Sequence, residues 1–120
     1  MMSNLSLIER LKKQRELVLE VDEFKFTLSR PTDLDIMELR GKDLPQSEIL
    51  KRYVKDWGGM TEAQIINGGT PERIDFDTEL FIEWIADKPN LIRSLVHEIV
   101  TAYQTHSVSL DDAIKKPSGG

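Results

Sequence analysis

Between residues 17 and 28, apolar side chains recur at every second position, in two sets: Leu17, Leu19, Val21 and Phe24, Phe26, Leu28. Strand side chains alternate between two faces, so this period predicts two short strands that share an apolar face, with a turn near Asp22 and Glu23. The turn lacks the Asn-Gly pair that tight hairpins favour, which leaves one continuous strand as the alternative. Pro31 ends the extended segment because it has no N–H to donate to a ladder.

Most of the remaining chain has helical spacing and helix-start signals. Thr32 and Asp77 stand where N-caps are expected, and Thr61 with Gln64 fits a capping box. Phe76 and Phe81 flank Asp77 at the two positions of a hydrophobic staple, so a helix is expected to start there. A short amphipathic helix is expected over residues 3–16.

The stretch DWGGMTEAQI, residues 56–65, places a tryptophan directly before two glycines. The apolar residues that precede it fall on one helical face: Ile49, Leu50, Tyr53, Val54 and Trp57. This spacing predicts a helix from Ser47 to Trp57 that Gly58 ends in the left-handed conformation. The stretch is then a joint between two helices, and Trp57 packs against its own core or against another protein.

Residues 91–103 carry apolar side chains over about half of the helix circumference, which is typical of a central helix. Together these segments predict an α+β fold, predominantly α-helical, with a small N-terminal β-hairpin or strand against four to five helices. We expect an N-terminal helical segment at 1–16, a single globular domain at 17–108 and a flexible C-terminal tail at 109–120.

Net charge and amino-acid composition exclude several classes of function. The 120 residues carry a net charge of −5 and include no cysteine. The net negative charge argues against a protein that binds nucleic-acid phosphates or an anionic membrane. No apolar run approaches the ~20 residues that span a bilayer. The lack of cysteine excludes disulfides and thiolate chemistry. A reducing cytoplasm is the expected compartment.

Catalytic and metal-binding motifs are not found in the sequence. The segment HEIVT at 97–101 has Thr101 where a zinc protease motif needs a second histidine, and His106 is turned to roughly the opposite face. The acids at 75, 77, 79 and 83 are interpreted as helix caps and a solvated face. We therefore expect no enzyme activity, no metal and no cofactor. The candidates for a protein interface are Trp57, Met60, Ile66 and Ile82.

Three segments carry a resemblance to a known family. They are the strand followed by RPT at 30–32, the pattern V-x-D-W-x-G-x-T-E-A at 54–63, and F-D-x-E-L-F-x-E-W-x-A-D-x-P at 76–89. In this order they resemble the tail assembly chaperones of tailed bacteriophages, over about 80 residues from 24 to 103. The polar segment AQIINGG departs from the family where an acid is expected after the alanine.

The resemblance implies a non-enzymatic binding protein. Such chaperones engage the tape-measure protein, and often the tail-tube protein, in the host cytoplasm before the tube polymerises, and they are absent from the finished virion. Self-association into a homo-oligomer is a further option. A structural virion protein, such as a tail-terminator or connector subunit, is the alternative, and a small enzyme or regulator is the third hypothesis.

Overall fold

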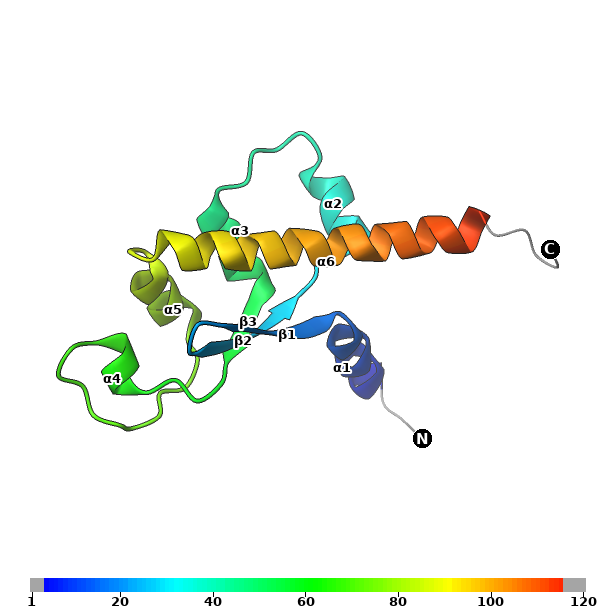
Figure 1. Ribbon diagram of the computed structural model, residues 1–120. Helices are drawn as coiled ribbons and strands as arrows, with labels where there is room; N and C mark the ends of the chain where they lie inside the picture. Colours follow the sequence, from blue (N-terminus) through cyan, green and yellow to red (C-terminus); the bar gives the residue numbers. More distant parts are fainter. Residues whose placement is uncertain (1–3, 116–120) are drawn as a thin grey trace.

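The computed structural model describes residues 4–115, with side chains described as far as residue 110. Its elements are, in chain order, α1 (Asn4–Gln14), β1 (Glu16–Val21), β2 (Phe24–Ser29), α2 (Asp33–Leu39), α3 (Gln46–Tyr53), β3 (Val54–Trp57), α4 (Glu62–Ile65), α5 (Thr78–Ile85) and α6 (Pro89–Lys115). The predicted α+β fold with a small N-terminal hairpin is confirmed. The long helix α6 runs past α3, the sheet and α2 (Figure 1).

The sheet has the order β1-β2-β3 and is antiparallel throughout. β1 and β2 form the hairpin rather than one continuous strand, and its register pairs Leu19 with Phe26 and Val21 with Phe24. Asp22 in the turn has φ 55°, in the left-handed region that Asp tolerates better than most residues. The expected turn therefore forms without the Asn-Gly pair.

The helix predicted from Ser47 to Trp57 is wrong in its second half, because α3 ends at Tyr53 and β3 follows at once. Pairing between β2 and β3 shifts register, so that Trp57 lies opposite Phe26 while Val54 lies opposite Leu28. Lys55 is the extra residue of a β-bulge. The bulge puts residues three apart on one buried face, and that spacing is indistinguishable from a helix turn in the sequence.

The two glycines after Trp57 also differ from the prediction. Gly58 does not take the left-handed conformation, and its N–H extends the strand pairing by donating to the Lys25 carbonyl at 2.9 Å. Gly59 is the residue with positive φ, at 68°. The chain thus turns one residue later than expected, directly before Met60 and the capping box of Thr61 with Gln64, which is confirmed around α4.

An aromatic cluster fills the centre of the core. Trp57 makes edge-on contacts with Phe76, Phe81 and Trp84, at ring-centroid distances of 5.3, 6.3 and 6.0 Å. The predicted staple is confirmed, since the Phe76 and Phe81 rings lie 5.6 Å apart and the Asp77 carboxylate accepts from Leu80 N–H. Buried residues of β2, α3, β3, α5 and α6 join this cluster, so these elements share one core.

The first and last described helices, α1 and α6, extend beyond the residues that form the core. Residues 109–115, predicted as tail, continue α6 to Lys115, because the first helix-breaking residue after Tyr103 is Pro117. Residues 116–120 of the predicted tail lie outside the described part of the chain. α1 forms as expected, but none of its residues is buried.

We expect the two core tryptophans to respond differently to substitution by phenylalanine. Trp57 Nε1 donates to the Ile74 carbonyl at 2.8 Å, whereas the buried Trp84 Nε1 has no partner in the described part of the chain. Trp57→Phe leaves a carbonyl unsatisfied, so it should cost about 1–2 kcal/mol more than Trp84→Phe. Urea unfolding of both variants measures this difference, with Trp57→Ala, expected to lose ~3–5 kcal/mol, as the reference for full truncation. Equal losses for the two phenylalanine variants would contradict the hydrogen-bond assignment.

Candidate functional site

The four residues predicted as an interface do not form one surface. Trp57 and Met60 are 5% and 2% exposed and belong to the core. Met60 lies in the core cluster, and its carbonyl accepts from Ile74 N–H at 2.8 Å, a hydrogen bond that joins the two ends of the 60–74 segment. Ile66 is 62% exposed, at the end of α4. Ile82 is half-buried and lines a small apolar hollow of about 210 Å³ between α3, α5 and α6.

A larger cavity of about 620 Å³ opens between the α1–β1 junction, the end of β2, and α3 with β3. We call it the basic cleft. Its lining includes six cationic side chains and two carboxylates: Lys12, Arg15, Arg30, Lys51, Arg52 and Lys55, with Glu16 and Asp35. In a chain with net charge −5, this is a pronounced local reversal of sign.

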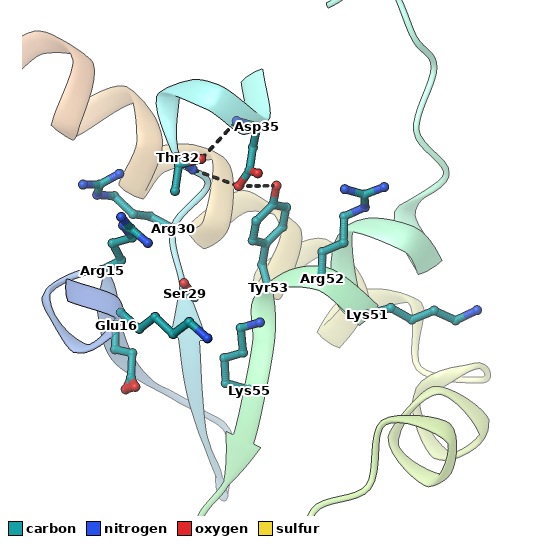
Figure 2. A pocket seen from close by; sticks show the side chains of 11 residues that line it. Arg15, Glu16, Ser29, Arg30, Thr32, Asp35, Lys51, Arg52, Tyr53 and Lys55 are labelled. Atoms are coloured by element: carbon teal, nitrogen blue, oxygen red, sulfur yellow. Dashed lines mark hydrogen bonds between the residues drawn. The ribbon is translucent and has the colours of Figure 1, made fainter. Parts of the chain in front are cut away.

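Backbone pairing brings these cations together from distant parts of the sequence. Arg30 N–H donates to the Arg15 carbonyl at 2.9 Å, which extends the hairpin by one pair and sets the two arginines side by side. Lys55 comes from the bulge of β3, where it is exposed while its neighbour Val54 is buried. Figure 2 shows Arg15 and Arg30 on one side of Tyr53, and Lys51 and Arg52 extending from α3 on the other.

The carboxylate of Asp35 is already engaged within the cleft. It accepts from Thr32 N–H at 3.0 Å, as part of the α2 capping box, and from the Tyr53 hydroxyl at 3.1 Å (Figure 2). Burial, followed by the charge and hydrogen bond of Asp35, raises the pKa of Tyr53 to about 12. Tyr53 therefore stays a neutral donor at physiological pH, and its hydroxyl shares one oxygen of Asp35, Oδ2, with the Thr32 N–H.

The cations of the cleft are poorly neutralised by the protein itself. Lys51 is 3.6 Å from Glu48, and Arg30 donates to its neighbouring Pro31 carbonyl. Lys12, Arg15 and Lys55 form no ion pair with another described residue. A site of this kind can bind an anionic group through charge-assisted hydrogen bonds, and two adjacent arginine forks suit a planar carboxylate or a phosphate.

A second polar cluster joins α2 to the far half of α6. The Asp33 carboxylate accepts from the Tyr103 hydroxyl at 2.9 Å and lies 3.1 Å from His106 Nε2. His97, by contrast, is exposed on α6. Among residues 4–110, no group of three or more His, Asp or Glu side chains is arranged to hold a metal ion. The Asp33 cluster is a tether between two helices rather than a metal centre.

Exposed aliphatic side chains gather on three helices. α1 exposes Leu5, Leu7, Ile8 and Leu11, α2 exposes Leu34 and Met37, and α6 exposes Val100, Val108 and Leu110. The sequence pattern identified an apolar side on α1, but it did not single out these residues as a surface. The basic cleft was missed altogether, because its cations are spread from residue 12 to residue 55 and no local run of charge marks them.

Comparisons with protein-family models, with curated proteins and with solved structures found no significant match to the chain. Within residues 4–115, no helix is both long and apolar enough to cross a bilayer.

The Asp33 tether should make stability sensitive to acid. Hydrogen bonds from His106 and then Tyr103 lower the pKa of Asp33 from its ordinary value of 3.8. A carboxyl group whose pKa is lower in the folded than in the unfolded chain stabilises the fold at pH values above the unfolded-state pKa. That stabilisation is lost as the pH falls through the folded-state pKa. The stability difference between wild type and Asp33→Asn should therefore shrink below about pH 4.

Urea unfolding at neutral pH and at about pH 3 measures this change, with the exposed loop residue Asp43 replaced by Asn as the control. A difference between wild type and Asp33→Asn that stays constant over this range would show that the tether does not depend on the carboxylate charge.

Proposed function

We propose that this protein is a non-enzymatic tail assembly chaperone of a tailed bacteriophage or prophage, which binds the tape-measure protein during tail morphogenesis, with the tail-tube protein as a second candidate partner. The observation that carries the proposal is the set of exposed aliphatic residues on α1, α2 and α6. Groups of such side chains are typical of protein-binding surfaces. The resemblance of residues 24–103 to the chaperone family supplies the identity of the partner.

The exposed faces of α1 and α2 suit the task of covering an apolar helix. A tape-measure protein is long, helical and apolar, and it would aggregate before the tube forms around it. A partner that covers its apolar stripe lowers the concentration of the aggregation-prone state by mass action. Exposed leucine, isoleucine and methionine side chains on α1 and α2 can accept the apolar face of an amphipathic helix. The binding must later reverse, which suits a surface of modest area.

The residues that define the core have structural roles in this proposal. The motifs that carry the resemblance contain Trp57, Thr61, Asp77 and Trp84, and these side chains form caps and the aromatic core. In this proposal they stabilise the fold that holds the exposed faces of α1, α2 and α6 in place, and they do not contact the partner. In this proposal the protein acts in the bacterial cytoplasm, and it dissociates from the tail before the virion is complete.

Co-expression with fragments of a tape-measure protein from the same genome tests the proposal. We expect a tagged version of this chain to retain a tape-measure fragment through purification and to keep that fragment in the soluble fraction. Deletion of the gene should abolish tails. The control is a tagged variant with Leu34→Gln and Met37→Gln on α2 and Leu7→Gln and Leu11→Gln on α1, which leaves the core intact and should release the fragment.

Mass spectrometry of purified particles separates this proposal from a structural role. The chaperone should be absent from virions, or present far below the copy number of any tail protein. Stoichiometric amounts in particles would overturn the proposal in favour of a tail-terminator or connector subunit.

A further inference from the structure

We propose that the basic cleft and the adjacent apolar row of α1 form one docking surface for an acidic amphipathic helix of a partner protein. Carboxylates of that helix would enter the cleft, and its apolar stripe would lie along Leu5 and Ile8. The identification of the partner as the tape-measure protein rests on the proposed function. The surface and the chemistry of its occupant do not.

The two parts of the surface are continuous through Lys12. Leu5, Ile8 and Lys12 are spaced by three and four residues, so they lie on one face of α1. Lys12 lines the basic cleft, while Leu5 and Ile8 are 66% and 47% exposed. A ligand that reaches from the cleft along α1 therefore meets cations first and aliphatic side chains next.

The cleft favours carboxylates for a reason of charge and geometry. Arg15 and Arg30 are held side by side by their backbone hydrogen bond, and Lys55 approaches from β3. Asp35 accepts from Thr32 and Tyr53 through one oxygen, Oδ2, and the described residues show no ion pair between Asp35 and these cations. Glu16 is the other carboxylate in the lining. An arriving acidic side chain thus gains pairing that the protein does not provide itself.

A protein helix explains the whole surface better than a nucleic acid does. The cleft gathers six cations in a chain whose net charge is −5, so the rest of the chain is strongly acidic and a long polyphosphate would meet like charge beyond the positive region. The apolar row of Leu5 and Ile8 offers nothing to a phosphate backbone. An amphipathic helix with an acidic face uses both the cations and the aliphatic side chains.

Fluorescence anisotropy with the full chain tests the proposal. The probe is a fluorescein-labelled designed peptide of about 18 residues, with leucines at helical spacing and glutamates on the neighbouring face. We expect it to bind, to weaken as salt rises through about 0.1 M, and to bind at least about tenfold more tightly than the same peptide with lysine in place of glutamate.

Two matched pairs of variants locate the site. Lys12→Glu with Lys55→Glu should weaken binding about tenfold or more, whereas Lys13→Glu with Lys42→Glu makes the same change of net charge outside the cleft and should have much less effect. Leu5→Gln with Ile8→Gln should also weaken binding, while Ile66→Gln, an exposed aliphatic position at the end of α4, should not. All seven positions are exposed, so the variants are expected to fold.

Several results would overturn the proposal. They are equal affinity for the acidic and basic peptides, equal loss in the cleft variant and its charge-matched control, and no loss from Leu5→Gln with Ile8→Gln. Tighter binding of a labelled single-stranded oligonucleotide than of the acidic peptide, lost in the cleft variant, would assign the cleft to nucleic acid instead. These results would not contradict the proposed function, which the co-purification with a tape-measure fragment tests separately. If the co-purification failed but the acidic peptide bound, the docking surface would stand and only the identification of the partner as a tape-measure protein would be wrong.

Discussion

The β-bulge at Lys55 decides which side chains of β3 reach the core. In a regular strand, Val54 and Trp57 would point to opposite faces, and one of them would leave the core. The bulge turns both inward, opposite Leu28 and Phe26, and leaves Lys55 on the outside. Trp57 can then contact Phe76, Phe81 and Trp84, which anchors α5 and its preceding loop. The same local irregularity therefore organises the aromatic core and supplies a cation to the basic cleft.

The buried residues lie in the centre of the molecule, whereas the exposed aliphatic side chains lie on its outer helices. Burial is concentrated in β2, β3, α3, α5 and the first half of α6, whereas α1 has no buried residue. The charges divide as well: the cleft gathers cations, while α5 and the loop before it carry exposed acids at 75, 77, 79 and 83. A stable scaffold that holds an amphiphilic surface at one side is suited to reversible binding, because partner contacts can form and break without disturbing the core.

The sequence was informative wherever a local signal decided the structure. The period-two residues of the hairpin, the caps at Thr32, Thr61 and Asp77, and the Phe76–Phe81 staple each act within a few residues, and all were predicted correctly. Three features depend on tertiary contacts and were not. Residues 54–57 form a strand because β2 offers an open edge, which overrides their helical spacing. The cleft depends on how β1, β2 and α3 meet. Met60 joins the core cluster at a point where residues 60 and 74, far apart in the sequence, are held together by a backbone hydrogen bond.

In the proposed mode of binding, α1 and the basic cleft contact the partner while the aromatic core stays unchanged. The sharpest test is amide hydrogen exchange, compared between the free protein and its complex with a co-purified tape-measure fragment. We expect added protection in α1, at the Arg15–Arg30 pair and around Lys55, with the aromatic core equally protected in both states. Protection confined to α5 or to the loop before it, with α1 exchanging as fast as in the free protein, would contradict it.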